Sequence, residues 1–147
     1  MTRRAKRHRT AVPEPRCVLD SGALTGLVGG SQRARAWLAW IAWHGGALVV
    51  PTPILAESTT GDGARDAEVN RVLGVLSRLG GALSAPDEAT ARRAGALRFR
   101  ARSDDGIDAL VAAAAVGDGS PCVLLTTDPS DLGKLLVNSR NVSVRRI

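Results

Sequence analysis

The sequence predicts an α/β fold in which helices cover both faces of a parallel β-sheet. Short apolar runs alternate with longer segments whose apolar residues recur at helical spacing, and glycine or proline clusters separate the two kinds of segment. Composition adds a constraint: 44% of the residues are hydrophobic but only 3% are aromatic, so Ala, Val and Leu must build the core. The 147 residues fit one domain, and no internal repeat divides them.

Five short apolar runs predict the strands. The first begins at Cys17 and ends where Asp20, Ser21 and Gly22 form a turn-like cluster. Glycine pairs precede the second and third runs, and the segment 117–121 breaks the chain before the fourth. The runs cover residues 17–19, 47–50, 82–84, 122–126 and 142–144.

The segments between these strands carry helix start and stop signals. Ser31 is placed to cap the helix that follows it, and Pro51, Pro53, Pro86 and Pro129 suit a first helical turn. The helix that begins at Pro51 and Pro53 contains Glu57 and ends before a loop at 60–63. The other predicted helices cover about residues 21–28, 32–43, 66–79, 86–100, 107–116 and 129–136.

Three tryptophans, Trp37, Trp40 and Trp43, recur at every third position of the helix at 32–43. Leu38 and Ile41 lie beside them in the sequence. Such a stripe more often belongs to a core or a dimer surface than to a platform on which RNA bases stack. We therefore expect the stripe to pack against protein.

The net charge of +6 is concentrated in the first residues. Residues 1–16 contain six basic side chains against the single acid Glu14, a net of +5, so residues 17–147 carry only +1. We expect a disordered basic extension over 1–16 and a folded domain over 17–147. Such an extension either contacts nucleic-acid phosphates without sequence preference or is simply solvated, and charge alone does not decide between the two.

The two cysteines, Cys17 and Cys122, each open an apolar run and are expected to be buried, reduced thiols. A zinc site is not expected, because His8 and His44 do not lie at ligand spacing from either cysteine. The sequence contains no run of about 18 apolar residues and no apolar stretch typical of a secretory signal near its start. We expect a cytoplasmic protein without a membrane span.

Four acidic residues from distant parts of the chain are predicted to meet at one edge of the sheet. Asp20 and Asp128 directly follow predicted strands, and functional groups of open parallel sheets collect beyond the carboxyl ends of the strands. Asp108 opens the helix that leads into the fourth strand, and Glu57 lies early in the helix after the second strand.

Clustered carboxylates repel one another and raise one another's pKa unless a cation neutralises them. Hard divalent cations resolve this repulsion, and Mg²⁺ combines a few carboxylates with waters and a substrate phosphate. Such an ion activates water and neutralises charge on a phosphodiester in the transition state. The pattern therefore predicts metal-assisted hydrolysis, which needs no Ser, Cys or His nucleophile, and the sequence offers no convincing triad.

Each acid also has a purely structural interpretation. Asp20 and Asp128 suit N-cap positions, the second of them directly before Pro129. Asp108 is favoured near a helix N-terminus by the helix dipole, and Glu57 suits an exposed surface. Only the joint placement of the four acids favours the functional interpretation.

Four segments resemble the signature segments of PIN domains, and more narrowly those of VapC-type toxins of bacterial toxin–antitoxin pairs. The resemblance runs from about residue 17 to the end of the chain. The segments are Val18-Leu19-Asp20-Ser21, Pro53-Ile54-Leu55-Ala56-Glu57, Gly106 to Ala113 (GIDALVAA) and Leu125 to Leu132 (LTTDPSDL). The chain departs from such toxins in one respect, since they often begin with methionine almost directly before the first strand and here 16 residues precede Cys17.

The resemblance implies a three-layer PIN-like fold with a metal site at its acidic edge. It implies Mg²⁺ or Mn²⁺ held by Asp20, Glu57, Asp108 and Asp128. It also implies supporting groups around these ligands, with a hydroxyl near the last acid. These further candidates are Ser21, Thr126 and Asp131, followed by Asp104 and Asp105.

The resemblance also implies an activity and partners. The expected activity is endoribonuclease cleavage by metal-activated water, which leaves a 5′-phosphate and a 3′-hydroxyl. The toxin would be restrained by a cognate antitoxin that inserts a basic side chain near the acids, and it would often form a homodimer. The helix with Trp37, Trp40 and Trp43 is a candidate surface for either contact.

A different class of function stays open from the residues alone. The chain would then be a non-catalytic PIN-like module that binds RNA through its basic extension or serves regulation. A receiver-like signalling domain would need a lysine after a late strand, and the only lysines, Lys6 and Lys134, are not so placed.

Overall fold

The structure is a computed structural model that describes residues 15–147. The segment 1–14 lies outside the described residues, so the predicted disorder of the basic extension stays a prediction. Arg16 is the first residue of the first strand.

The core of the fold is a five-stranded sheet in the order β3-β2-β1-β4-β5, with every neighbouring pair parallel. This confirms the predicted parallel α/β architecture. The first strand lies at the centre and is the most deeply buried, since Cys17, Val18 and Leu19 are all fully inaccessible. The strands are β1 Arg16–Leu19, β2 Ala47–Pro51, β3 Ala82–Ser84, β4 Cys122–Thr126 and β5 Val142–Arg146.

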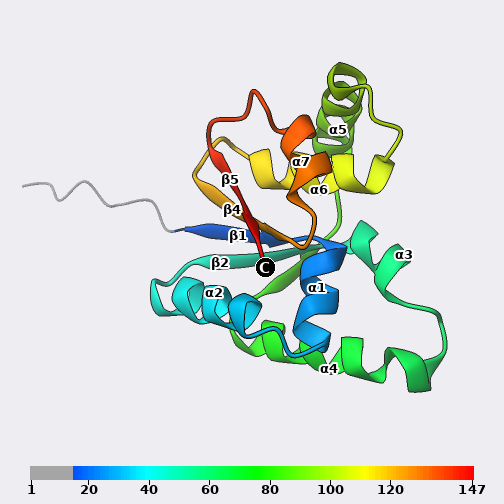
Figure 1. Cartoon of the computed structure of the whole chain (residues 1–147), viewed down its shortest axis with the longest axis vertical. Helices are drawn as coiled ribbons and strands as arrows, with labels where there is room; N and C mark the ends of the chain where they lie inside the picture. Colours follow the sequence, from blue (N-terminus) through cyan, green and yellow to red (C-terminus); the bar gives the residue numbers. More distant parts are fainter. Residues whose placement is uncertain (1–14) are drawn as a thin grey trace, which may run out of the picture.

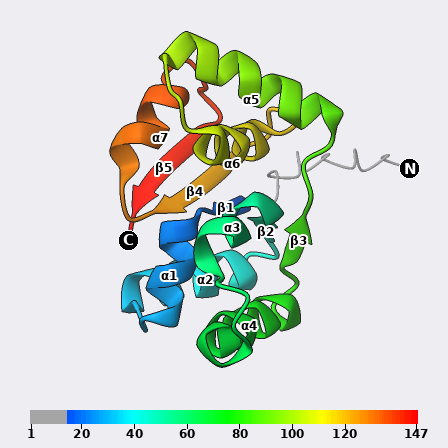
Figure 2. The ribbon, with the colours of Figure 1, turned by 90° about the vertical axis from the view of Figure 1, so that its right-hand side faces the viewer.

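Helices form a layer on each face of this sheet (Figure 1). One layer contains α5 Glu88–Ala101, α6 Gly106–Val116 and α7 Pro129–Leu135. The other contains α1 Ser21–Val28, α2 Gln32–Trp43 and α4 Gly63–Arg78. Because all strands are parallel, their carboxyl ends share one edge, which faces the viewer in Figure 2 together with the short helix α3 Leu55–Ser58 and the 3₁₀ turn Thr52–Ile54 before it.

Helices α4 and α5 begin at other residues than the sequence predicted. Helix α4 begins at Gly63, because Asp62 accepts hydrogen bonds from the first backbone N–H groups of the helix. Asp66, predicted as its first residue, lies one turn inside and is buried. Helix α5 begins at Glu88 rather than Pro86, because the Asp87 side chain caps it.

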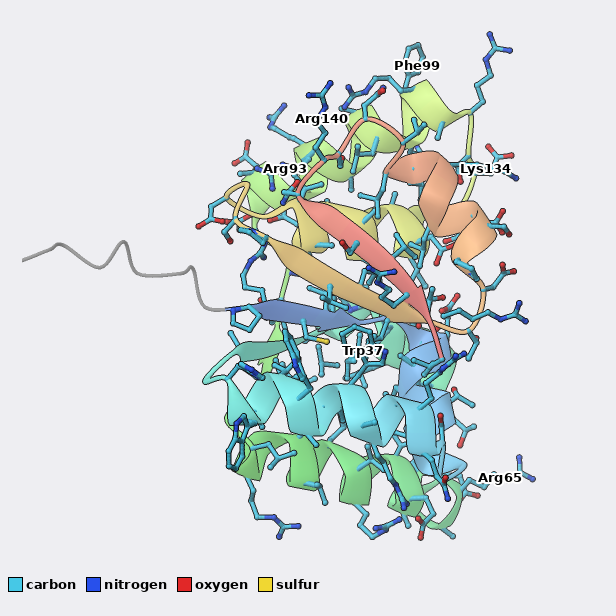
Figure 3. The ribbon with its side chains drawn as sticks, turned by 60° about the vertical axis from the view of Figure 1, so that its left-hand side comes forward. Trp37, Arg65, Arg93, Phe99, Lys134 and Arg140 are labelled. Atoms are coloured by element: carbon cyan, nitrogen blue, oxygen red, sulfur yellow. The ribbon has the colours of Figure 1, made fainter. Side chains whose placement is uncertain are left out.

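The tryptophan stripe of α2 is divided between the core and the surface. Trp37 packs against the core and lies between α2 and the strands (Figure 3), while Leu38 and Ile41 beside it are buried. Trp40 and Trp43 are 46% and 88% exposed. The prediction that the stripe packs against protein is therefore confirmed for Trp37 only.

Cys17 and Cys122 are free, buried thiols, as predicted. Burial raises the pKa of Cys17 to about 12 and that of Cys122 to about 11. Because the thiolate is the reactive form, these cysteines are chemically inert at neutral pH.

None of the helices in residues 15–147 combines the length and the apolar character that a membrane crossing requires.

Arg16 fastens the start of β1 to the end of α6. Its guanidinium donates to the Ser120 hydroxyl (2.8 Å), to the carbonyl of Ala115 (2.8 Å) and to the carbonyl of Ser120 (3.1 Å). Longer bonds reach the carbonyls of Ala114 and Val116. The side chain thus satisfies the carbonyls that a helix leaves unpaired at its C-terminus, where the helix dipole favours a cation.

We predict that Arg16→Met lowers the free energy of unfolding by about 2–4 kcal/mol, because the carbonyls at the end of α6 lose a charged donor and stay buried. Urea unfolding followed by circular dichroism measures the change. Arg78→Met in the last turn of α4 is the matched control, since Arg78 is exposed, and it should change stability by less than about 0.5 kcal/mol. Equal effects of the two substitutions would contradict the proposed role of Arg16.

Candidate active site

Asp20 stands at the centre of the acidic edge, directly after β1. Its backbone N–H donates to the carbonyl of Leu125 (3.2 Å), which ties the end of β1 to β4. Its side chain accepts from the N–H of Ala23 (2.7 Å) and so caps α1, and it is only 7% exposed. The structural interpretation of Asp20 as an N-cap is therefore correct, and one face of the carboxylate is held in a fixed position.

Burial raises the pKa of Asp20, and the charge of Glu57 adds to the increase. Hydrogen bonds from the Thr126 hydroxyl and from the N–H groups of Ala23 and Gly22 oppose the increase without cancelling it. The carboxylate is therefore held in an environment that disfavours its charge unless a cation is near.

Thr126 lies between Asp20 and Asp128 and is almost fully buried. Its hydroxyl accepts the backbone N–H of Asp128 (3.0 Å). It carries a single proton, for which the carbonyl of Asp128 (3.2 Å) and the carboxylate of Asp20 compete. An ionised carboxylate is the stronger acceptor, so Thr126 links the two acids when Asp20 is charged.

Asp108 lies in the first turn of α6 and is half-buried. Its backbone N–H donates to the side chain of Asp105 (2.9 Å), which caps the helix. Burial raises the pKa of Asp108 to about 6, with the charges of Asp105, Asp20, Glu57 and Asp131 adding to the increase in that order.

Glu57 projects from α3 at the same edge and is exposed. It lines an open pocket of about 450 Å³ together with Ser21 and Thr127. Since the charge of Glu57 acts on both Asp20 and Asp108, three of the four predicted acids lie within electrostatic reach of one another.

Asp128 lies at the same edge, but its neighbours are Ser130 and two basic side chains. Its side chain accepts from the backbone N–H (3.1 Å) and hydroxyl (2.7 Å) of Ser130 and so caps α7. These hydrogen bonds, and then the charges of Arg146 and Lys134, lower its pKa. The acid of this segment whose charge reaches Asp108 is instead Asp131, which pairs with Lys134 at 3.4 Å.

The remaining candidates divide by location. Ser21 borders the pocket beside Glu57, and Asp105 acts on Asp108 as a cap and as a neighbouring charge. Asp104 is exposed in the loop before α6. Sequence reasoning missed Thr127, which also borders the pocket. Only the structure reveals Thr127, because it shows that a side chain at Gly22 would overlap the Thr127 hydroxyl.

The donor set suits a hard divalent cation, because it consists of carboxylate oxygens and because burial, followed by the charges of neighbouring acids, raises the pKa of Asp20 and Asp108. It is not a closed cage. Within residues 15–147, no three His, Cys, Asp or Glu side chains stand together at metal-ligating geometry. The fit therefore rests on the chemistry of the donors and on the open pocket beside them, which leaves room for water and a phosphate.

We predict that Asp108→Asn stabilises the metal-free protein at high pH. The folded carboxyl has a pKa of about 6, above its unfolded value, so the folded state binds more protons between these values and wild-type stability falls as pH rises from 4 to 7. With an allowance for partial solvent screening, the variant should be more stable by about 1–2 kcal/mol at pH 8 and equal to wild type near pH 4. Urea unfolding with a chelator at both pH values measures this, and Asp104→Asn is the control.

We predict that Gly22→Ala destabilises the protein by about 1–3 kcal/mol, because the new methyl group overlaps the Thr127 hydroxyl and pushes the loop between β4 and α7 away from α1. Gly74→Ala in α4 is the matched control, because a side chain there meets nothing within 4 Å and should stabilise by about 0.5–1 kcal/mol. Thermal unfolding measures both. An unchanged melting temperature in Gly22→Ala would contradict the prediction, because it would show that the loop moves away at no cost in stability.

Comparison with known proteins identifies the family. Residues 17–133 match the PIN domain family, which is most of the chain. No curated protein sequence matches. Among solved structures, the chain is similar to a chain of the crystal structure of VapBC2 from Rickettsia felis bound to a DNA fragment from their promoter, with a TM-score of 0.65 and 14% identity over 90% of this chain and 98% of that one. The match to the family, on a parallel sheet with its acids gathered at the carboxyl edge, shows that the chain belongs to the PIN domain family.

Proposed function

We propose that this protein is a Mg²⁺- or Mn²⁺-dependent endoribonuclease and the toxin of a toxin–antitoxin pair. PIN domains are generally nucleases that depend on divalent metals. The observation that carries the proposal is the placement of Asp20, Glu57 and Asp108 at one edge beside an open pocket, where burial, and then the charges of neighbouring acids, raise the pKa of Asp20 and Asp108; a divalent cation would stabilise such a cluster.

In this proposal, Asp20, Asp108 and Asp128 hold the metal, and Glu57 completes the site or orients water. A bound divalent ion lowers the pKa of a water molecule and neutralises charge that develops on the phosphate. The protein holds the acidic side chains in place. The hydrogen bond by which Asp20 caps α1 fixes Asp20, and the Thr126 hydroxyl holds the loop that carries Asp128. Water attacks in line, and the products carry a 5′-phosphate and a 3′-hydroxyl.

The surroundings of the acids predict which of them are the dominant metal ligands in this proposal. The charge of Asp20 acts on Asp108, and these two acids are expected to be the dominant ligands. Asp128 already has one oxygen engaged with Ser130 and two cations nearby, so it offers its other oxygen. Asp131 is the alternative acid from the same segment.

We predict that Asp20→Asn lowers cleavage of a single-stranded RNA by at least about a hundredfold. Asp118→Asn is the matched control, because Asp118 is an exposed acid in the turn after α6, beside Arg16 and so at the opposite edge of the sheet. A chelator should abolish the cleavage and Mg²⁺ or Mn²⁺ should restore it. Cleavage by Asp20→Asn at the wild-type rate would refute the assignment.

The same assay separates the catalytic proposal from a non-catalytic PIN-like module. A scaffold would bind RNA equally well with and without a chelator and would cut none of it. Sequencing of the RNA ends after controlled expression identifies the cleaved target.

The toxin assignment also implies protein partners, a cognate antitoxin and a second copy of this chain, in the cytoplasm. The likeness to a chain of the VapBC2 complex supports the antitoxin. The exposure of Trp40 and Trp43 on α2 supports a protein contact at that helix, since large apolar side chains exposed side by side often mark interaction sites.

A further inference from the structure

The end of β5 directs two neighbouring arginines to opposite faces of the sheet. Arg145 pairs with Leu125 and Arg146 with Thr126. Successive side chains of a strand alternate between faces, whereas paired residues of parallel strands share one. Arg146 therefore shares the face of Thr126, which contacts the acids. Arg145 lines a groove beside Trp37 on the other face.

The side chain of Arg146 is accessible to a ligand. The side chain is exposed, and no salt bridge in residues 15–147 includes it. Its position follows from the strand register, since Arg146 pairs with Thr126, two residues before Asp128, and the next residue, Ile147, donates its N–H to the Thr126 carbonyl. An arginine in this state offers up to five N–H donors to a ligand.

Lys134 provides a second cation on the same flank. It projects from α7 (Figure 3), the helix that the Asp128 side chain caps. Its ammonium group lies 3.4 Å from the Asp131 carboxylate, so part of its charge is compensated. The acidic edge thus has a negative part around Asp20 and Asp108 and a positive flank at Arg146.

A polyanion that approaches the acids needs such a flank, because carboxylates without a full complement of metal ions repel phosphates. A guanidinium is suited to the task, since its planar donors match two oxygens of one phosphate. We propose that Arg146, assisted by Lys134, binds a phosphate of the RNA strand next to the phosphate that is cleaved. This inference rests on the proposed ribonuclease function and adds a substrate-binding site to it.

Binding is tested without cleavage. The probe is a fluorescent single-stranded RNA, titrated with the full-length chain in the presence of a chelator over a series of salt concentrations. Arg146→Gln should weaken binding about tenfold and reduce the slope of log affinity against log salt by about 0.7. Arg145→Gln, one residue away on the other face, is the matched control and should leave both values within about twofold of wild type, and Arg146→Lys should recover part of the affinity.

Cleavage kinetics give a second readout. Arg146→Gln should raise KM about as much as it weakens binding and leave kcat within about threefold, because the side chain binds a phosphate that does not react. Lys134→Gln should act in the same direction with a smaller effect. Circular dichroism of each variant shows whether the fold is kept.

The outcomes distinguish this inference from the proposed function. Equal loss of binding in Arg145→Gln and Arg146→Gln would show that only the net charge of the protein matters, and it would overturn the inference. Unchanged binding in Arg146→Gln, or no RNA binding by wild type, would overturn it as well. If wild type cleaves RNA and Arg146→Gln binds and cleaves it equally well, the phosphate site is refuted and the ribonuclease proposal stands. RNA binding that depends on Arg146 without any cleavage would support the phosphate site and refute the nuclease.

Discussion

The parallel pairing of β1 with β4 is the constraint on which the acidic edge depends. Because the two strands run in the same direction, Asp20 after one and Asp128 after the other leave the sheet on the same side. The hydrogen bond from the Asp20 N–H to the Leu125 carbonyl extends this pairing to the acid itself. The buried Thr126 hydroxyl then connects the two loops. An antiparallel pairing would have placed these acids at opposite ends of the molecule.

The structural and functional interpretations of the acids turn out to be compatible. Asp20 caps α1 and Asp105 caps α6, and each accepts the backbone N–H groups that a helix leaves unpaired. The positive ends of these helices stabilise negative charge. Helix capping thereby offsets part of the repulsion among these carboxylates. In the proposed site, the side chain of Asp20 would cap α1 and also offer its other oxygen to a ligand.

Sequence reasoning was sufficient for the fold and for the edge at which the acids gather, because strand ends and parallel topology follow from apolar runs and helical spacing. It could not give the surroundings of each carboxylate. The charge of Arg146 reaches Asp128 because β5 extends beyond the predicted run at 142–144, which pairs Arg146 with Thr126. The start of α4 was missed for a similar reason, since the choice of Asp62 over Asp66 as cap depends on the local path of the loop.

The last residue described here is part of the same edge. The Ile147 N–H donates to the Thr126 carbonyl (2.9 Å), and its side chain lies against Gly26 of α1. Anything fused behind Ile147, such as an affinity tag or a reporter protein, would emerge next to Asp20 and Asp128 and obstruct the approach of a ligand. The first strand begins at Arg16, at the opposite edge of the sheet from these acids, so a purification handle is better placed before the N-terminus.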